Sequence, residues 1–143
     1  MADYSTSVDI EAPAEIVFAH LTTADGMVAW MGRHATLNPV SGGEFSVDID
    51  GTPIRGRFVE VDPPRRVVVT WGVAGSDEFP AGSSQVEFTL TPIDGGTRLD
   101  LVHTALPESK AAGYAAGWAH FLGRLWTVAA GRDPGPDLLT WRA

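Results

Sequence analysis

The feature that most constrains this fold is a series of short stretches in which apolar and polar residues alternate, each followed by turn residues. Phe45 and Val47 fall on one side of such a stretch, and Asp50-Gly51 after it is a strong hairpin signal. Alternation places every second side chain on the same face of a strand. The expected strands are residues 4–10, 44–49, 54–61, 67–71, 84–91 and 97–105. They indicate a meander of antiparallel strands with one apolar face.

The stretch VDPPRRVVVTW, residues 61–71, predicts a sharp turn between two of these strands. Proline lacks a backbone N–H and restricts the residue before it, so Pro63-Pro64 ends the first strand. The three valines, Thr70 and Trp71 that follow favour a pleated, buried surface. We expect this turn to fold the sheet back on itself, so that Trp71 projects toward a helix.

Two short helices are expected after the first strand, and a longer helix after the last strand. Pro13 suits the first turn of a short helix, and Thr22 or Thr23 can cap a second short helix that reaches Trp30 or Met31. A third helix is expected from about residue 107 to residue 130, ended by Gly131. Its apolar stripe consists of Tyr114, Trp118, Phe121, Leu125 and Val128. His120 falls on the opposite side, toward solvent.

These elements predict an α+β fold: a curved antiparallel sheet of about six or seven strands around a long C-terminal helix, with two short helices after the first strand. A chain of 143 residues fits one domain. We expect that domain over residues 1–131 and a tail over residues 132–143. Leu138, Leu139 and Trp141 make the tail apolar, so it should dock on the domain or on a second subunit, and a homodimer is one alternative.

The composition and the motifs of the sequence argue against several classes of function. The net charge of −8 argues against a nucleic-acid partner or an anionic membrane, because both require a basic surface. The absence of cysteine excludes disulfides and thiolate sites. The N-terminus lacks the features of a signal peptide, so a cytoplasmic location is expected. No cofactor motif is present, and the histidines show no metal-ligand spacing, so neither a cofactor nor a metal is expected.

The order of these motifs resembles a known family. The residues that carry the resemblance are Val61–Arg66 followed by Thr70-Trp71, Gly95–Leu99 followed by His103, and Gly117-Trp118 followed by Leu122 and Leu125. The sequence is similar to the proteins named for homology to the activator of heat shock protein 90 ATPase. They form part of the START-like (SRPBCC) superfamily, with the polyketide cyclases and the major birch pollen allergen. The resemblance covers about residues 4–130.

The resemblance implies a helix-grip fold with a deep apolar cavity between the long helix and the sheet. Eukaryotic co-chaperones of the family carry an extra N-terminal domain that this sequence lacks, so a chaperone partner is not expected. A small apolar ligand is the expected partner, since two short helices leave the mouth of the sheet open. The candidate ligand-binding residues, placed by alternation or helical face, are Trp30, Phe45, Val47, Phe58, Val69, Trp71, Phe88, Leu101, His103, Trp118, Phe121 and Leu122. Plain core packing is the alternative for each of them.

His103 is the candidate catalytic residue, because it lies on the apolar face of its strand and can act as an acid or a base. The alternative is a histidine with satisfied hydrogen bonds, and no second acid or base pairs with it by sequence. Glu60 shares the parity of Phe58, so it either points inward or lies in water at the strand end. Arg55 and Arg57 should face outward, pairing with acidic residues on neighbouring strands.

Three functions remain open. The first is a protein that binds a small apolar or aromatic ligand without an assigned reaction. The second is a cyclase or dehydratase acting on a polyketide-like substrate with His103 as the acid or base. The third is a chaperone-type interaction module. A purely apolar cavity would favour the first, buried polar groups in the cavity the second, and a filled core the third.

Overall fold

The computed structural model describes residues 1–139 and residue 141. The elements, in chain order, are β1 (Ala2–Ile10), α1 (Ala14–Thr22), α2 (Ala24–Val28), β2 (His34–Leu37), β3 (Glu44–Ile49), β4 (Thr52–Asp62), β5 (Arg66–Trp71), β6 (Ser84–Ile93), β7 (Gly96–Leu106), the 3-10 helix η1 (Glu108–Lys110) and α3 (Ala111–Ala129). The α+β class and the two short helices after the first strand are as the sequence predicts. Among the described residues, no helix is long and apolar enough to cross a membrane.

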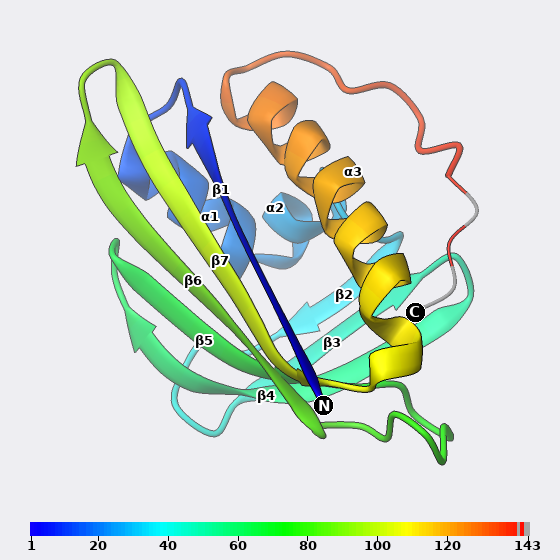
Figure 1. Ribbon diagram of the computed structural model, residues 1–143. Helices are drawn as coiled ribbons and strands as arrows, with labels where there is room; N and C mark the ends of the chain where they lie inside the picture. Colours follow the sequence, from blue (N-terminus) through cyan, green and yellow to red (C-terminus); the bar gives the residue numbers. More distant parts are fainter. Residues whose placement is uncertain (140, 142–143) are drawn as a thin grey trace.

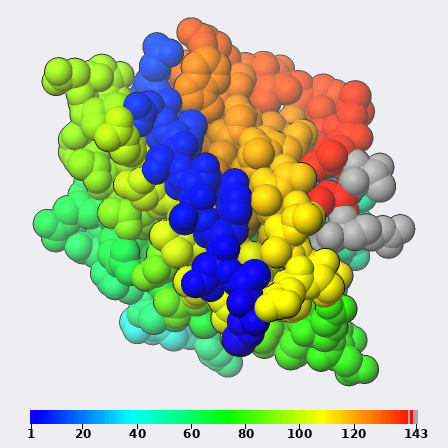
Figure 2. All heavy atoms as spheres, in the orientation of Figure 1, coloured from blue at the N-terminus to red at the C-terminus, as the bar shows by residue number. Residues whose placement is uncertain are grey.

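A single sheet of seven strands forms the body of the molecule, in the order β1-β7-β6-β5-β4-β3-β2. Every neighbouring pair is antiparallel. The sheet curves around α3, and α1 and α2 lie near the C-terminal half of that helix (Figure 1). β1 closes the chain back on itself by pairing with β7, so that the first strand lies beside the last (Figures 1 and 2). The helix-grip prediction is confirmed.

α3 presents its aromatic stripe to the concave face of the sheet. Tyr114, Trp118, Phe121 and Leu125 are all buried. The helix ends in a Schellman motif, with Gly131 at a φ of 84°, where a side chain would be strained. The N–H of Gly131 donates to the carbonyl of Val128 at 3.0 Å, and the N–H of Arg132 to that of Thr127 at 3.1 Å. Glycine at residue 131 therefore ends the helix as its sequence predicts.

The turn after Val61 reverses the chain between β4 and β5. The Pro63-Pro64 peptide bond is cis, and the N–H of Arg65 donates to the carbonyl of Asp62 at 2.7 Å. A register shift between Phe58 and Glu60 interrupts the alternation of β4 before the turn. Because of this irregularity, both Val59 and Glu60 are exposed. Glu60 therefore lies in water, and its carboxylate pairs with Arg66 at 3.2 Å.

Two local features depart from or refine the expected elements. β2 was not among the strands expected from the sequence, because its four residues are too few to show a period. Thr23 caps α2, since its Oγ1 accepts from the N–H of Gly26 at 3.0 Å.

On the outer face of the sheet, Arg55 donates to a carboxylate oxygen of Asp48 at 2.8 Å. The outward placement of Arg55 and Arg57 is as predicted.

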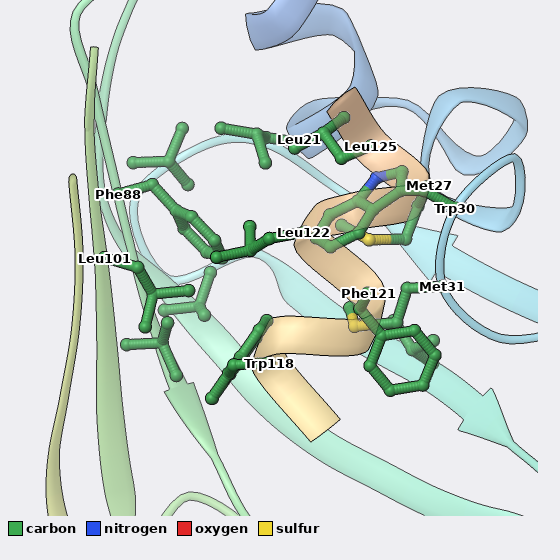
Figure 3. Packing of buried hydrophobic residues seen from close by; sticks show 14 of the residues in the cluster. Leu21, Met27, Trp30, Met31, Phe88, Leu101, Trp118, Phe121, Leu122 and Leu125 are labelled. Carbon is green, nitrogen blue, oxygen red and sulfur yellow. The ribbon is translucent and has the colours of Figure 1, made fainter. Parts of the chain in front are cut away.

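The core lies between the sheet and the three helices. Trp118, Leu122 and Leu125 of α3 face Phe88 and Leu101 of the sheet, and Phe121 turns toward Met31 (Figure 3). Trp30, Met27 and Met31 cover the helix from its other side. All of these side chains are buried and belong to one continuous cluster. Burial of this much apolar surface is what holds the sheet and α3 together.

Candidate functional site

The residues expected from the sequence to bind a ligand lie together in the interior. Each is less than 5% exposed, and all but His103 belong to the apolar cluster, which surrounds that histidine. They are Trp30, Phe45, Val47, Phe58, Val69, Trp71, Phe88, Leu101, His103, Trp118, Phe121 and Leu122. They come from the segment after α2, from five strands and from α3, so the fold joins residues that are distant in sequence.

The centre of this interior is filled by two indoles. The ring centroids of Trp71, on the sheet, and Trp118, on α3, lie 5.3 Å apart. Phe45 packs against Trp71 at 5.8 Å, and Phe88 against Trp118 at 6.0 Å. These are contact distances for aromatic rings, which leave no room for a ligand between the two indoles. The sequence-based expectation placed a gap there, and in this conformation the large side chains occupy it.

A surface cleft of about 640 Å³ lies elsewhere, on the outer face of the sheet. It is lined by Glu44, Ser46, Arg55, Gly56, Arg57, Thr70, Ala81 and Gly82. These residues belong to β3, β4 and β5 and to the loop before β6. The cleft is thus separated by the sheet from the residues selected by sequence.

His103 is held at the interior by a chain of hydrogen bonds. The indole N–H of Trp118 donates to its Nδ1 at 3.1 Å, and its Nε2 lies 2.8 Å from Oγ of Ser84. Ser84 in turn donates its hydroxyl proton to the carbonyl of Trp71 at 2.8 Å. Because Nδ1 accepts and the serine proton is already used, Nε2 must carry the proton. The arrangement therefore fixes one neutral tautomer of the imidazole.

Burial reinforces this neutral state. Desolvation lowers the pKa of His103 to about 3, because the charged imidazolium would lose its water. Burial raises the pKa of the Tyr114 hydroxyl, which accepts the indole N–H of Trp71 at 3.0 Å. Both groups are uncharged at neutral pH. Since both ring nitrogens of His103 are already bonded, the histidine has no free atom with which to move a proton on a ligand.

Two residues of this network were not selected from the sequence. Ser84 shares the inward parity of Val86 and Phe88, so its position was predictable, but a serine at a strand end gave no reason to single it out. Tyr114 was placed on the helical stripe without a polar role. Among the described residues, no buried side-chain nitrogen or oxygen lacks a hydrogen-bond partner, and no group of acidic residues and histidines could hold a metal ion.

Trp141, in the tail, covers the N-terminal half of α3. Its ring lies 5.0 Å from that of Tyr114 and 5.4 Å from that of Phe121, and it is only 8% exposed. The indole N–H donates to the carbonyl of Gly113 at 3.0 Å. A side chain at Gly117 would place its Cβ 2.6 Å from the indole, so only glycine lets the ring lie against the helix backbone. We call this position, bounded by Gly113, Tyr114, Gly117 and Phe121, the indole seat.

The rest of the tail is held by few contacts. Asp137 accepts from Nε2 of His120 at 2.9 Å, and Arg124 donates to the carbonyl of Gly135 at 3.1 Å. The expectation that His120 faces solvent is therefore only partly met, because the tail covers its imidazole. Leu138 is 87% exposed and Leu139 38% exposed. The expected docking of the tail thus applies to Trp141 and not to the two leucines.

A curved seven-stranded sheet gripping one long helix, with an aromatic interior, defines a START-like domain of the helix-grip class. A family model described as Activator of Hsp90 ATPase homolog 1-like protein matches residues 11–130. The chain belongs to this family. The family resemblance found in the sequence is confirmed.

Solved structures of several proteins resemble the chain. An AHSA1-like protein from Rhizobium etli is 41% identical, with 99% of this chain and 90% of that chain covered and a TM-score of 0.75. DynU16, a putative protein in the dynemicin biosynthetic locus, is 27% identical, with 92% and 48% covered and a TM-score of 0.77. The Aha1 dimer from Colwellia psychrerythraea is 21% identical, with 96% and 100% covered and a TM-score of 0.78. No curated protein sequence matches the chain.

Proposed function

We propose that the protein binds a small apolar or aromatic ligand between the sheet and α3. The observation that carries the proposal is the aromatic interior, two of whose rings, Tyr114 and Phe121, are covered by one tail residue, Trp141. Ligand pockets of this kind combine apolar and aromatic walls with a few fixed polar groups. Here the polar groups are the hydroxyls of Ser84 and Tyr114 beside His103.

Binding requires a rearrangement of the interior. Trp71 and Trp118 are in contact, so a ligand enters only if the tail leaves the seat and the indoles repack. A binding-competent form that is a minor population lowers the apparent affinity by its fraction. We therefore expect about micromolar affinity for a probe that is not the natural ligand, or about −8 kcal/mol.

The test is a tryptophan-quenching titration of the wild type with naphthalene-type dyes, flavonoids and fatty acids. Saturable binding of one class supports the proposal. Phe88→Trp provides the comparison, because a larger ring beside Trp118 should weaken binding. If no probe binds the wild type at concentrations on the order of 1 mM, where only −4 kcal/mol is required, the proposal is overturned.

A second candidate is an interaction module, and the filled interior is the observation that favours it. The relative from Colwellia psychrerythraea is solved as a dimer, so a second copy of the chain is one partner to test. Sedimentation equilibrium over a hundredfold range of concentration measures this directly. A purely monomeric protein at all concentrations would remove the homodimer.

A cyclase or dehydratase reaction is the weaker alternative. The similar protein DynU16 is described as a putative protein in the dynemicin biosynthetic locus, and a biosynthetic setting agrees with an enzymatic role. The bonds of His103 weigh against it here, because its two ring nitrogens are used by Trp118 and Ser84. A reaction would need a substrate that displaces one of these partners.

A further inference from the structure

We propose that the indole seat on α3 is a binding subsite for a flat aromatic molecule bearing one N–H or O–H, and that Trp141 is its tethered competitor. The proposal rests on the proposed function, because the seat borders the same aromatic interior through Tyr114. It adds the chemical class of the ligand and a role for the tail. The observations that carry it are the shape of the seat, its one hydrogen-bond acceptor and the few contacts that hold the tail apart from Trp141.

The shape of the seat selects a flat ring. The atoms nearest to an added Cβ at Gly117 are Cε2, Nε1 and Cζ2 of Trp141, at 2.6–2.8 Å. The indole therefore lies directly on the helix backbone, where any side chain would exclude it. The rings of Tyr114 and Phe121 stand nearly perpendicular to it, at 79° and 77°. These edge-to-face contacts favour an aromatic occupant over an aliphatic one.

One acceptor in the seat selects a donor. The carbonyl of Gly113 lies within α3 and accepts the Trp141 N–H at 3.0 Å in addition to its place in the helix. A carbonyl has two lone pairs, so this second bond does not require the helix to open. An occupant with an indole N–H or a phenol O–H can replace the tail residue, while one without a donor leaves the second lone pair of this carbonyl without a partner.

The tail can leave the seat without breaking a helix or a strand, because it is anchored mainly by Trp141 itself. Residues 132–139 form neither helix nor strand, and Leu138 projects into water. Segments with few buried contacts open at low free energy. The seat also communicates with the interior, because Tyr114 contacts Trp141 on one side and accepts a hydrogen bond from Trp71 on the other. An occupant of the seat thus abuts the ring that fills the interior.

Indole is the probe, measured by calorimetry and by thermal unfolding. Trp141→Ala empties the seat, so indole should bind this variant with a Kd on the order of 0.1–1 mM, as expected for so small a molecule, and raise its melting temperature. Binding to the wild type should be at least ~10-fold weaker, because the tethered Trp141 competes at a high effective concentration. In the double variant Gly117→Ala/Trp141→Ala, the Cβ at residue 117 occupies the seat, and indole should not bind.

Two controls address the site and the chemical class. Gly123→Ala/Trp141→Ala adds the same methyl group on α3 where no atom lies within 4 Å, so indole binding should be retained. N-methylindole lacks the donor to Gly113 and should bind Trp141→Ala more weakly than indole does. Equal binding of both molecules, or of indole to the two double variants, would overturn the assignment.

A further measurement covers the case in which Trp141→Ala does not stay folded. In the wild type, excess indole should shift the Nε1–H resonance of Trp141, assigned by its loss in Trp141→Phe, toward its position in an unstructured peptide. An unmoved resonance at saturating indole would contradict the proposal. If the dyes bind the wild type and indole binds nowhere, the seat assignment fails and the proposed function stands. If nothing binds, both fail.

Discussion

The indole N–H of Trp118 donates to Nδ1 of His103 at 3.1 Å, and this one bond decides the state of the histidine. An Nδ1 that accepts leaves the proton on Nε2, which then donates to Ser84. A charged imidazolium would carry a proton on Nδ1 and oppose the indole donor. His103 is therefore neutral, with both ring nitrogens in hydrogen bonds, and its pKa gives a first prediction.

We expect His103 to make the protein less stable in acid. Its pKa in the folded state is about 3, below the value of about 6.5 in the unfolded chain, so between these values the unfolded chain binds more protons. The stabilisation is therefore complete above pH 6.5 and is lost as the pH falls toward 3. Between pH 7 and pH 4.5, the free energy of unfolding should fall by about 2.5 kcal/mol.

Urea unfolding of the wild type and of His103→Gln at both pH values isolates this effect. Glutamine can bond Trp118 and Ser84 but does not titrate, so most of the fall should disappear in the variant. An equal fall in both proteins would show that other groups cause it. An imidazole NMR titration checks the same point, because a His103 that titrates between pH 5 and 8 contradicts its burial.

Trp118→Phe should lower the free energy of unfolding by about 3 kcal/mol. The substitution removes ring volume from the core and leaves Nδ1 of His103 without its donor. Trp126→Phe on the same helix is the matched control, since Trp126 is half-buried at the edge of the core. Its cost should be about 1 kcal/mol or less. Similar costs for both would mean that the bond to His103 contributes little.

Trp141→Ala should lower the free energy of unfolding by about 3 kcal/mol, because it removes a ring that is 92% buried against α3. Leu138→Ala in the same tail should change it by less than about 0.5 kcal/mol, because that side chain projects into water. Chemical denaturation of the two variants measures the difference. If the two substitutions cost the same, Trp141 is not docked in solution.

Gly56→Ala and Gly123→Ala should change stability in opposite directions. A Cβ at residue 56 would lie 1.9 Å from the carbonyl oxygen of Thr70, which belongs to the neighbouring strand, so we expect a loss of about 3 kcal/mol or more. At residue 123 there is open space, and alanine should stabilise α3 by about 1 kcal/mol. Melting temperatures that move the same way would contradict the close approach of β4 to β5.

The elements whose signal is local could be predicted from the amino-acid sequence. Alternation located β3 and β6, the β-branched run after Pro63-Pro64 located β5, and Gly131 marked the end of α3, because these signals depend on residues close in the chain. Alternation alone places Glu60 on the same face as Phe58. In the structure it lies on the other face, because a register shift in β4 exchanges the faces of the strand, and such a shift depends on the partner strand. The local pattern also did not reveal β2, which exists because it pairs with β3.

The contents of the interior depend on the packing of segments that are distant in sequence. Periodicity placed Trp71 and Trp118 on facing elements, but whether a gap separates them depends on the distance between sheet and helix, which here brings their rings to 5.3 Å. The partners of His103 are 15 and 19 residues away in sequence, and those of Trp141 lie on a helix about two dozen residues before it. The pattern of apolar residues along the chain shows which side chains are buried. Their hydrogen-bond partners and the free volume of the interior arise from the packing of distant segments.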